Sequence, residues 1–213
     1  MGDVLEQSWL RVRRLAKKYA DDWEGQDLIG DAPLRVFAGG QAPRQVLVVT
    51  KEAIASRWQR YWSAGLVVVV TSGIVTRAQA AVLELASDGL FPIPFVGDAD
   101  PMGLHTYLSL RSHLGAQRVQ FCGICDSVLD MMGEDEAQPE RLESLELSRF
   151  DQAHLRVVEA LATPEQVLGP RVAAVLRNGR KIELEALSFR ADLMIPALFK
   201  AAFSLSRAQR GHA

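Results

Sequence analysis

The sequence predicts an α/β protein with a parallel-rich, Rossmann-like sheet and helices on both faces, and three observations lead to this prediction. Four short β-branched runs are apolar throughout, which is typical of strands that are covered on both faces. Segments with helical spacing of apolar residues separate them. An Asp/Gly/Pro turn follows the third run, at the end of a strand where open α/β sheets bind ligands. The runs are Val46–Val49, Leu66–Val70, Ile93–Val96 and Val119–Ile124.

Length and composition exclude several classes of protein. The 213 residues allow one domain with a full core, or one domain and a small appendage. The net charge of −2 argues against a protein that binds polyanions by bulk charge, so any nucleic-acid surface must be a local patch. No apolar run approaches the roughly 20 residues of a membrane span, and the N-terminus lacks a signal-peptide pattern. We therefore expect a cytoplasmic protein that is not in a membrane.

We expect residues 1–43 to form a basic amphipathic helix and a linker. Apolar residues recur at helical spacing over residues 5–23, and arginines and lysines occupy the other positions. This basic face either contacts nucleic acid or is a solvated surface, and the second interpretation is favoured. Residues 24–44 contain Gly, Asp and Pro, which predicts a loop with one short strand at Leu34–Phe37.

We expect residues 44–205 to form one domain with a mostly helical C-terminal extension. An acidic surface loop is expected at Met132–Arg141, and Ser148 or Asp151 is the expected cap of the next helix. Thr163-Pro-Glu-Gln166 is typical of a helix start, with threonine at the cap and proline in the first turn. The remaining expected helices cover 52–62, 76–87, 103–114, a stretch ending at about 161, 163 to about 178, and 191–207, with a polar-apolar segment at Lys181–Leu187.

Two aspartates in the turn after the third strand are the strongest candidate for a functional site. Asp98 and Asp100 are two residues apart, and Pro101 and Gly103 follow them. If strand geometry continues through the turn, both carboxylates face one spot. Adjacent like charges favour a cation between them, and an all-oxygen pair suits Mg²⁺. The alternative is a solvated turn between a strand and a helix.

The two cysteines, Cys122 and Cys125, form a Cys-x-x-Cys pair, which can be redox-active or half of a zinc site. There is no second such pair, and the segment reads as a buried strand. We favour a structural role in the core.

Several segments together resemble one family, the TOPRIM domain of the DNA topoisomerase VI A subunit and of the related meiotic double-strand-break protein. The resemblance runs from about residue 44 to about residue 200, and the common order of the segments carries it. The most specific segment is Gly97-Asp-Ala-Asp-Pro-Met-Gly-Leu-His105. The others are Val46–Ile54, Thr71–Arg77, Cys122–Asp126, Leu147–Asp151 and Lys181–Leu187.

The resemblance implies a Mg²⁺ site made by a glutamate after the first strand and by Asp98 and Asp100. In this family a tyrosine on a separate winged-helix domain attacks DNA, and the protein works as a dimer. Carried over, Arg77 contacts phosphate, and Lys51 is a further candidate for a nucleic-acid contact. His105 is another possible phosphate contact, although Arg77 and His105 also fit a plain helix surface.

This sequence departs from the family at two points. The family glutamate falls on Thr50, and Glu52, two residues later, either substitutes for it or is a first-turn helix carboxylate. Only about 44 residues precede the TOPRIM-like segment, too few for a winged-helix domain. We therefore do not expect cleavage by the tyrosine mechanism from this chain alone.

Two functional hypotheses follow. In the first, the chain binds Mg²⁺ through Asp98, Asp100 and Glu52 and also binds the DNA backbone. It then acts in DNA cleavage, either with a partner that supplies the nucleophile and carries a winged-helix or ATPase domain, or with an activated water. In the second, the acidic cluster is catalytically degenerate and the fold is a binding or dimerisation module of a DNA-processing or defence complex. An unrelated α/β phosphotransferase or hydrolase does not explain the ordered C-terminal matches.

Overall fold

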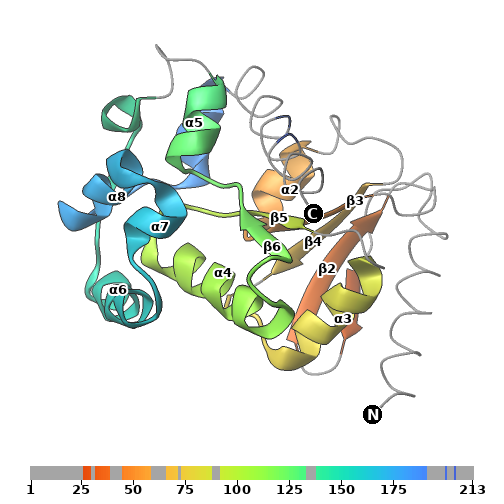
Figure 1. The fold of residues 1–213 in the computed structure, drawn as a ribbon. Coiled ribbons are helices and arrows are strands. Elements are labelled where there is room, and N and C mark those ends of the chain that lie inside the picture. Colours follow the sequence, from red (N-terminus) through yellow and green to blue (C-terminus); the bar gives the residue numbers. More distant parts are fainter. Residues whose placement is uncertain are drawn as a thin grey trace.

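The fold is a six-stranded mixed sheet with helices on both faces, as seen in a computed structural model (Figure 1). The structure describes residues 26–29, 32–38, 45–58, 66–71, 73–87, 92–132 and 138–190, together with residues 200 and 204. The helices predicted at 5–23 and, except for these last two residues, at 191–207 lie outside the described residues.

Four parallel strands form the centre of the sheet. They are β3 (Gln45–Val49), β4 (Leu66–Thr71), β5 (Ile93–Val96) and β6 (Val119–Phe121), in the order β4-β3-β5-β6. The side chains of β4 and β5 are buried throughout, as strands covered on both faces require. The predicted α/β class with a parallel-rich sheet is confirmed.

An antiparallel hairpin extends this sheet at the β4 edge. It consists of β1 (Gln26–Ile29) and β2 (Ala32–Ala38), and β2 pairs with β4. The short strand predicted at Leu34–Phe37 lies within β2. The hairpin occupies the stretch that the sequence predicts to be mainly loop, and it belongs to the same sheet as the parallel strands.

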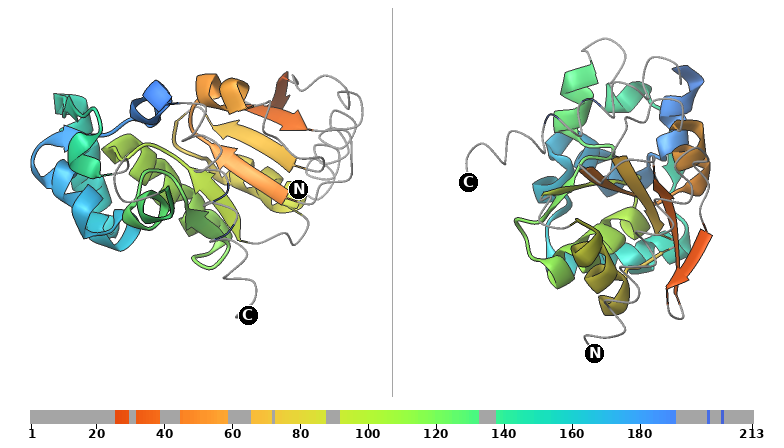
Figure 2. Two further views of the ribbon diagram at one scale, coloured as in Figure 1. Left: turned by 90° about the horizontal axis from the view of Figure 1, so that it is seen from above. Right: turned by 90° about the vertical axis from the view of Figure 1, so that its right-hand side faces the viewer.

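Helices cover both faces of the parallel strands, in agreement with the prediction. The helix α2 (Glu52–Trp58) packs on one face, and α3 (Arg77–Ser87) and α4 (Pro101–Leu114) pack side by side on the other (Figures 1 and 2). Right-handed crossovers require this division, because the chain moves in one direction from β3 to β4 and in the opposite direction from β4 to β5 and β6.

The C-terminal extension is mostly helical and lies at the end of the sheet away from the hairpin (Figure 2). It begins after α5 (Asp126–Met132), a helix that the sequence analysis does not predict. It contains the 3-10 helices η2 (Pro139–Arg141) and η3 (Leu184–Arg190), the strands β7 (Leu145–Glu146) and β8 (Arg180–Lys181), and the helices α6 (Arg149–Leu161), α7 (Pro164–Leu168) and α8 (Pro170–Arg177).

One predicted helix of the extension is in fact two. The expected helix from Thr163 breaks at Gly169, whose φ of 82° lies in the region that favours glycine, and Pro170 starts α8. Of the two expected caps of α6, Ser148 is the N-cap. Its side chain accepts from the Asp151 N–H, and the Asp151 side chain accepts from the Ser148 N–H.

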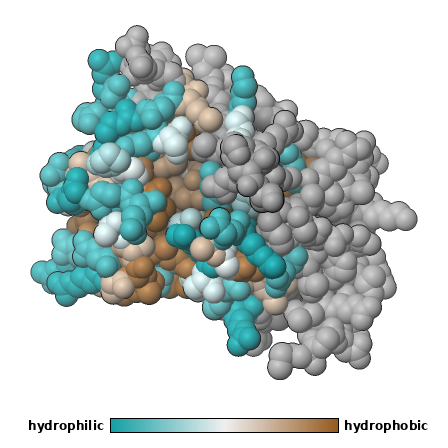
Figure 3. All heavy atoms as spheres, viewed as in Figure 1, coloured by the Kyte–Doolittle hydropathy of each residue, from teal (hydrophilic) through white to brown (hydrophobic). Residues whose placement is uncertain are grey.

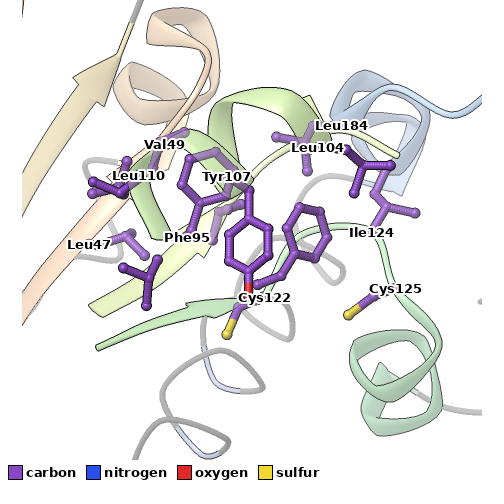
Figure 4. Packing of buried hydrophobic residues seen from close by; sticks show 14 of the residues in the cluster. Leu47, Val49, Phe95, Leu104, Tyr107, Leu110, Cys122, Ile124, Cys125 and Leu184 are labelled. Atoms are coloured by element: carbon purple, nitrogen blue, oxygen red, sulfur yellow. The ribbon is translucent and has the colours of Figure 1, made fainter. Parts of the chain in front are cut away.

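The core beneath the carboxyl ends of the strands is aromatic. Phe95, Tyr107 and Phe121 pack with ring centroids 5.4–6.0 Å apart (Figure 4). Cys122 and Cys125 are buried near them as free thiols, and burial raises the pKa of both thiols. This geometry agrees with the structural role that the sequence favours for the cysteines. No helix among the described residues is long and apolar enough to cross a membrane.

Candidate functional site

The order of the strands creates a switch point between β3 and β5. These strands are neighbours, but the chain leaves β3 toward α2 on one face and leaves β5 toward α4 on the other. Ligands of open α/β sheets bind at such a switch point, outside the carboxyl ends of the strands. The residues that follow the two strands, Thr50 to Glu52 and Gly97 to Asp100, therefore form the candidate site.

The turn after β5 is held rigidly at the start of α4. Asp100 is the N-cap of α4, and its Oδ1 accepts a 2.5 Å hydrogen bond from the Gly103 N–H. Pro101 occupies the first helical position, so α4 starts two residues earlier than predicted. Position 103 requires glycine, because a Cβ there would lie 2.8 Å from the Asp98 carbonyl oxygen and 2.9 Å from Asp100 Oδ1. The motif is thus a helix cap with a close backbone approach.

Asp98 is buried and its two oxygens have different partners. Oδ1 accepts a 2.7 Å hydrogen bond from the backbone N–H of Leu184, and Oδ2 lies 3.3 Å from Lys51 Nζ. Burial, reinforced by the charge of Asp100, raises the pKa of Asp98 to about 7, although Lys51 and the Leu184 N–H oppose this rise. Asp98 therefore exchanges a proton near neutral pH.

Lys51 is the cation of the site. Its Nζ lies 3.2 Å from Glu183 Oε2 and 2.5 Å from Glu185 Oε2, in addition to its contact with Asp98. Burial lowers the pKa of Lys51, but the charges of Asp98, Glu185 and Glu183 together raise it above the ordinary lysine value. The ammonium group thus stays charged and joins three carboxylates from two distant parts of the chain.

A second lysine continues this network into the C-terminal extension. Lys181 Nζ lies 3.4 Å from Asp151 Oδ2 and 3.4 Å from Glu183 Oε1, so Glu183 joins the two ammonium groups. The backbones of Ala99 and Ile182 exchange two hydrogen bonds of 2.9 and 3.1 Å. Residues 181–187 are therefore fastened to the carboxyl edge of the sheet by both backbone and side-chain contacts.

The predicted site residues divide into two groups. Asp98, Asp100 and Lys51 come together at the switch point, as their positions after β3 and β5 imply. Glu52 is exposed in the first turn of α2, and Arg77 is exposed at the start of α3, which lies at the same edge of the sheet. Thr50 stands where the resemblance places a glutamate, and its buried hydroxyl has no hydrogen-bond partner among the described residues.

His105 belongs to a different environment from the one expected of a phosphate contact. It is half-buried on α4, and its Nδ1 lies 3.0 Å from Nδ1 of His154 on α6. Burial and the nearby His154 lower the pKa of His105. The imidazole pair joins the sheet domain to the extension.

A bound Mg²⁺ ion does not fit the site as it is arranged. The ion requires near-octahedral oxygen ligands, whereas both Asp98 oxygens already face N–H donors and Asp100 Oδ1 caps α4. Over the described residues, no group of three or more His, Cys, Asp or Glu side chains is placed to hold a metal ion. Glu52, Asp98 and Asp100 thus do not form such a group, and the Lys51 ammonium takes the position of the cation.

From the sequence, Lys51 is a candidate nucleic-acid contact and the two aspartates are candidate metal ligands. The acidic partners Glu183 and Glu185 are not among the predicted site residues, and neither are Lys181 and Asp151. The two contacts from Lys51 to the glutamates span 132 and 134 residues of sequence, so no local pattern signals them.

Comparisons with known proteins add little to this geometry. No family model matches the chain, and no curated protein is detectably similar to it. Among solved structures, the carboxylesterase CesB (YbfK) of Bacillus subtilis aligns at 12% identity and a TM-score of 0.30, covering 77% of this chain and 72% of the other. A protein assigned as a lipase (lip1) of Acinetobacter baumannii AYE aligns at 14% identity and a TM-score of 0.32, covering 82% and 71%. Scores this low carry no argument about function.

Proposed function

We propose that the chain is a TOPRIM-like module that has exchanged the metal of the acidic site for the Lys51 ammonium, and that it serves as a non-catalytic binding subunit of a cytoplasmic DNA-processing or defence complex. The observation that carries the proposal is the position of Lys51 Nζ, at 3.3, 3.2 and 2.5 Å from carboxylates of Asp98, Glu183 and Glu185. This internal cation offsets part of the carboxylate charge and already faces the oxygens that a divalent ion would need as ligands.

The charge around the switch point also disfavours direct contact with a DNA backbone there. Two ammonium groups, Lys51 and Lys181, face five carboxylates. The ionised cluster has an excess of negative charge, which repels phosphate unless a further cation is added. In this proposal the site fastens the extension to the sheet, and contacts with partners are made by other surfaces.

A second candidate function is metal-dependent DNA cleavage with a partner that supplies the nucleophile. The observation in its favour is that Asp98 and Asp100 are both buried at the switch point, where the hydroxyl of Thr50, at the end of β3, also has no hydrogen-bond partner among the described residues. In this case Asp98 and Asp100 would hold the ion after displacement of Lys51, and the ion would neutralise the phosphate of the bound DNA.

Calorimetric titration with Mg²⁺ and Mn²⁺ separates the two functions. We expect no binding by the wild-type protein below about millimolar concentration, which is the weak end of the range for oxygen-ligand sites. The Lys51→Gln variant should gain Mn²⁺ binding, because the three carboxylates lose their internal cation, and adding Asp98→Asn should abolish it. Arg177→Gln, which removes an exposed cation paired with Glu165, is the matched control.

The outcome that contradicts the proposal is micromolar Mg²⁺ binding by the wild-type protein that is lost in Asp98→Asn. That result supports the metal-dependent function, and cleavage of supercoiled plasmid by the protein with added Mg²⁺ would then be the next assay. Fluorescence anisotropy with a duplex DNA, measured with and without Mg²⁺, shows whether any DNA affinity depends on the ion.

A further inference from the structure

The outer face of α6 carries an apolar stripe that the described part of the protein does not cover. Three of its large side chains are exposed: Phe150 by 60%, Val157 by 41% and Leu161 by 62%. Ala153 and Ala160 lie between them on the same face, because residues 3, 4 and 7 apart are neighbours on a helix. We call these five residues the α6 stripe. Apolar surface is visible in the α6 region in Figure 3.

The helix itself is firmly attached, so the stripe is a rigid surface. Val158 and Asp151 on the adjoining face of the helix are buried, and α6 packs along α4. The ring of Phe150 packs edge-on against His154, with centroids 4.5 Å apart, and His154 is joined to His105 of α4. An exposed aromatic side chain that is held in this way loses little entropy when it enters a partner's pocket.

The spacing of the stripe is that of a helix–helix interface. Phe150, Ala153, Val157 and Ala160 follow the alternating three- and four-residue spacing of a coiled-coil seam. The large residues supply apolar area, and the alanines between them let a partner backbone approach closely. A helix fits this surface better than a strand or an irregular loop does.

The charges beside the stripe indicate the kind of helix. Arg149 and Arg156 border it on the solvent side, seven residues apart, and neither forms an ion pair with a described residue. In an antiparallel twofold pair of α6 helices the same flanks would face each other, which places arginine against arginine. That pairing of two copies is therefore disfavoured, and acidic residues flanking the seam of a different helix match the charges.

We propose that the α6 stripe docks an amphipathic α-helix of a partner protein whose apolar seam is flanked by acidic side chains. This inference gives the binding subunit proposed above its binding surface and rests on that function. Its test does not involve Lys51 or Asp98, so either proposal can fail without the other.

The test uses the full-length protein and two designed 21-residue helical peptides as probes. Both carry leucine and alanine at the seam positions, and they differ only in having glutamate or lysine at the flanking positions. We expect the protein to bind the glutamate peptide at least tenfold more tightly than the lysine peptide in fluorescence anisotropy at low salt. In the Arg149→Glu/Arg156→Glu variant this preference should reverse.

Variants of the α6 stripe distinguish specific docking on this surface from non-specific hydrophobic binding. Val157→Asp should weaken binding of the glutamate peptide at least tenfold, whereas Gln152→Asp, which adds the same charge on α6 outside the stripe, should change it less than threefold. Both positions are exposed, and circular dichroism checks that each variant folds. Leu161→Gln is a second stripe variant that removes apolar area without adding charge.

Three results would overturn the proposal. The first is equal affinity for the two peptides, and the second is equal loss in Val157→Asp and Gln152→Asp. The third is a wild-type dimer in light scattering that becomes a monomer in Val157→Asp, which would assign the stripe to a second copy of this chain.

Discussion

Replacing Asp98 by asparagine should stabilise the protein, and more so as the pH rises. The carboxyl group is buried at the carboxyl edge of β5, and burial raises its pKa from 3.8 to about 7. The folded state therefore holds the proton to a higher pH than the unfolded state does. Above pH 7 the native protein must keep a buried carboxylate, whereas an asparagine stays neutral and its amide oxygen can still accept from the Leu184 N–H.

The size of the effect follows from proton linkage. A pKa that is raised in the folded state contributes no penalty below the unfolded pKa, and the full penalty is reached above the folded pKa. One pKa unit corresponds to about 1.4 kcal/mol, so the raised pKa of Asp98 costs on the order of 4 kcal/mol at pH 8.5 and on the order of 2 kcal/mol at pH 5. These values are upper limits on the expected gain from Asp98→Asn, and a gain that is about 2 kcal/mol larger at pH 8.5 than at pH 5 is the distinguishing result.

Urea unfolding at pH 5, 6, 7 and 8.5 measures this difference directly. The control is Asp130→Asn, which removes an exposed carboxylate paired with Arg171 and should change the free energy of unfolding by less than about 1 kcal/mol at every pH. If Asp98→Asn destabilises the protein at pH 8.5, or changes its stability equally at all pH values, then the attraction to Lys51 outweighs burial and our account of the site is wrong.

Three further predictions concern contacts that hold separate elements together. His105→Gln should reduce the loss of thermal stability between pH 7.5 and 5.5, because the lowered pKa of His105 beside His154 makes the native state bind fewer protons than the unfolded state below about pH 6.5. Asp126→Ala should lower the free energy of unfolding by about 2 kcal/mol in urea titration, since its carboxylate accepts from two backbone N–H groups in the first turn of α8. Gly123→Ala should lower the free energy of unfolding by about 3 kcal/mol or prevent soluble expression, because a Cβ there would lie 2.0 Å from the Gly97 carbonyl oxygen. A variant that behaves like the wild-type protein in its assay refutes the contact assigned to that residue.

The sheet and the acidic turn could be predicted because local patterns determine them. Apolar runs such as Leu66–Val70 have the composition of a doubly covered strand, and the structure confirms them. Capping residues carry equally local signals, and Ser148, one of the two expected caps, is the N-cap of α6. The Gly169-Pro170 dipeptide is also a local signal of a break, but the prediction of a single helix rested only on the start at Thr163 and the glycine end near Asn178-Gly179.

The arrangement of the candidate site could not be predicted in the same way. The partners of Lys51 depend on the path of the extension, which returns Glu183 and Glu185 to the carboxyl edge of the sheet after more than 80 residues beyond Asp98. A lysine at a strand end is an ordinary observation, and only the tertiary contacts show that its ammonium lies among carboxylates. The same limit applies to His105, because its contact with His154 depends on the packing of α6 against α4.

The Asp-x-Asp-Pro-x-Gly motif has a physical explanation in this protein that requires no metal. Asp100 caps α4, Pro101 fits the first helical position, and Gly103 leaves room for the close backbone approach. Asp98 ties residues 181–187 to the sheet by its bond to Leu184 and its contact with Lys51. Each residue type would be required even if no ion ever bound, so the motif alone is weak evidence for metal chemistry. What decides between the two functions is whether the Lys51 ammonium stays among the carboxylates or is displaced by a metal ion.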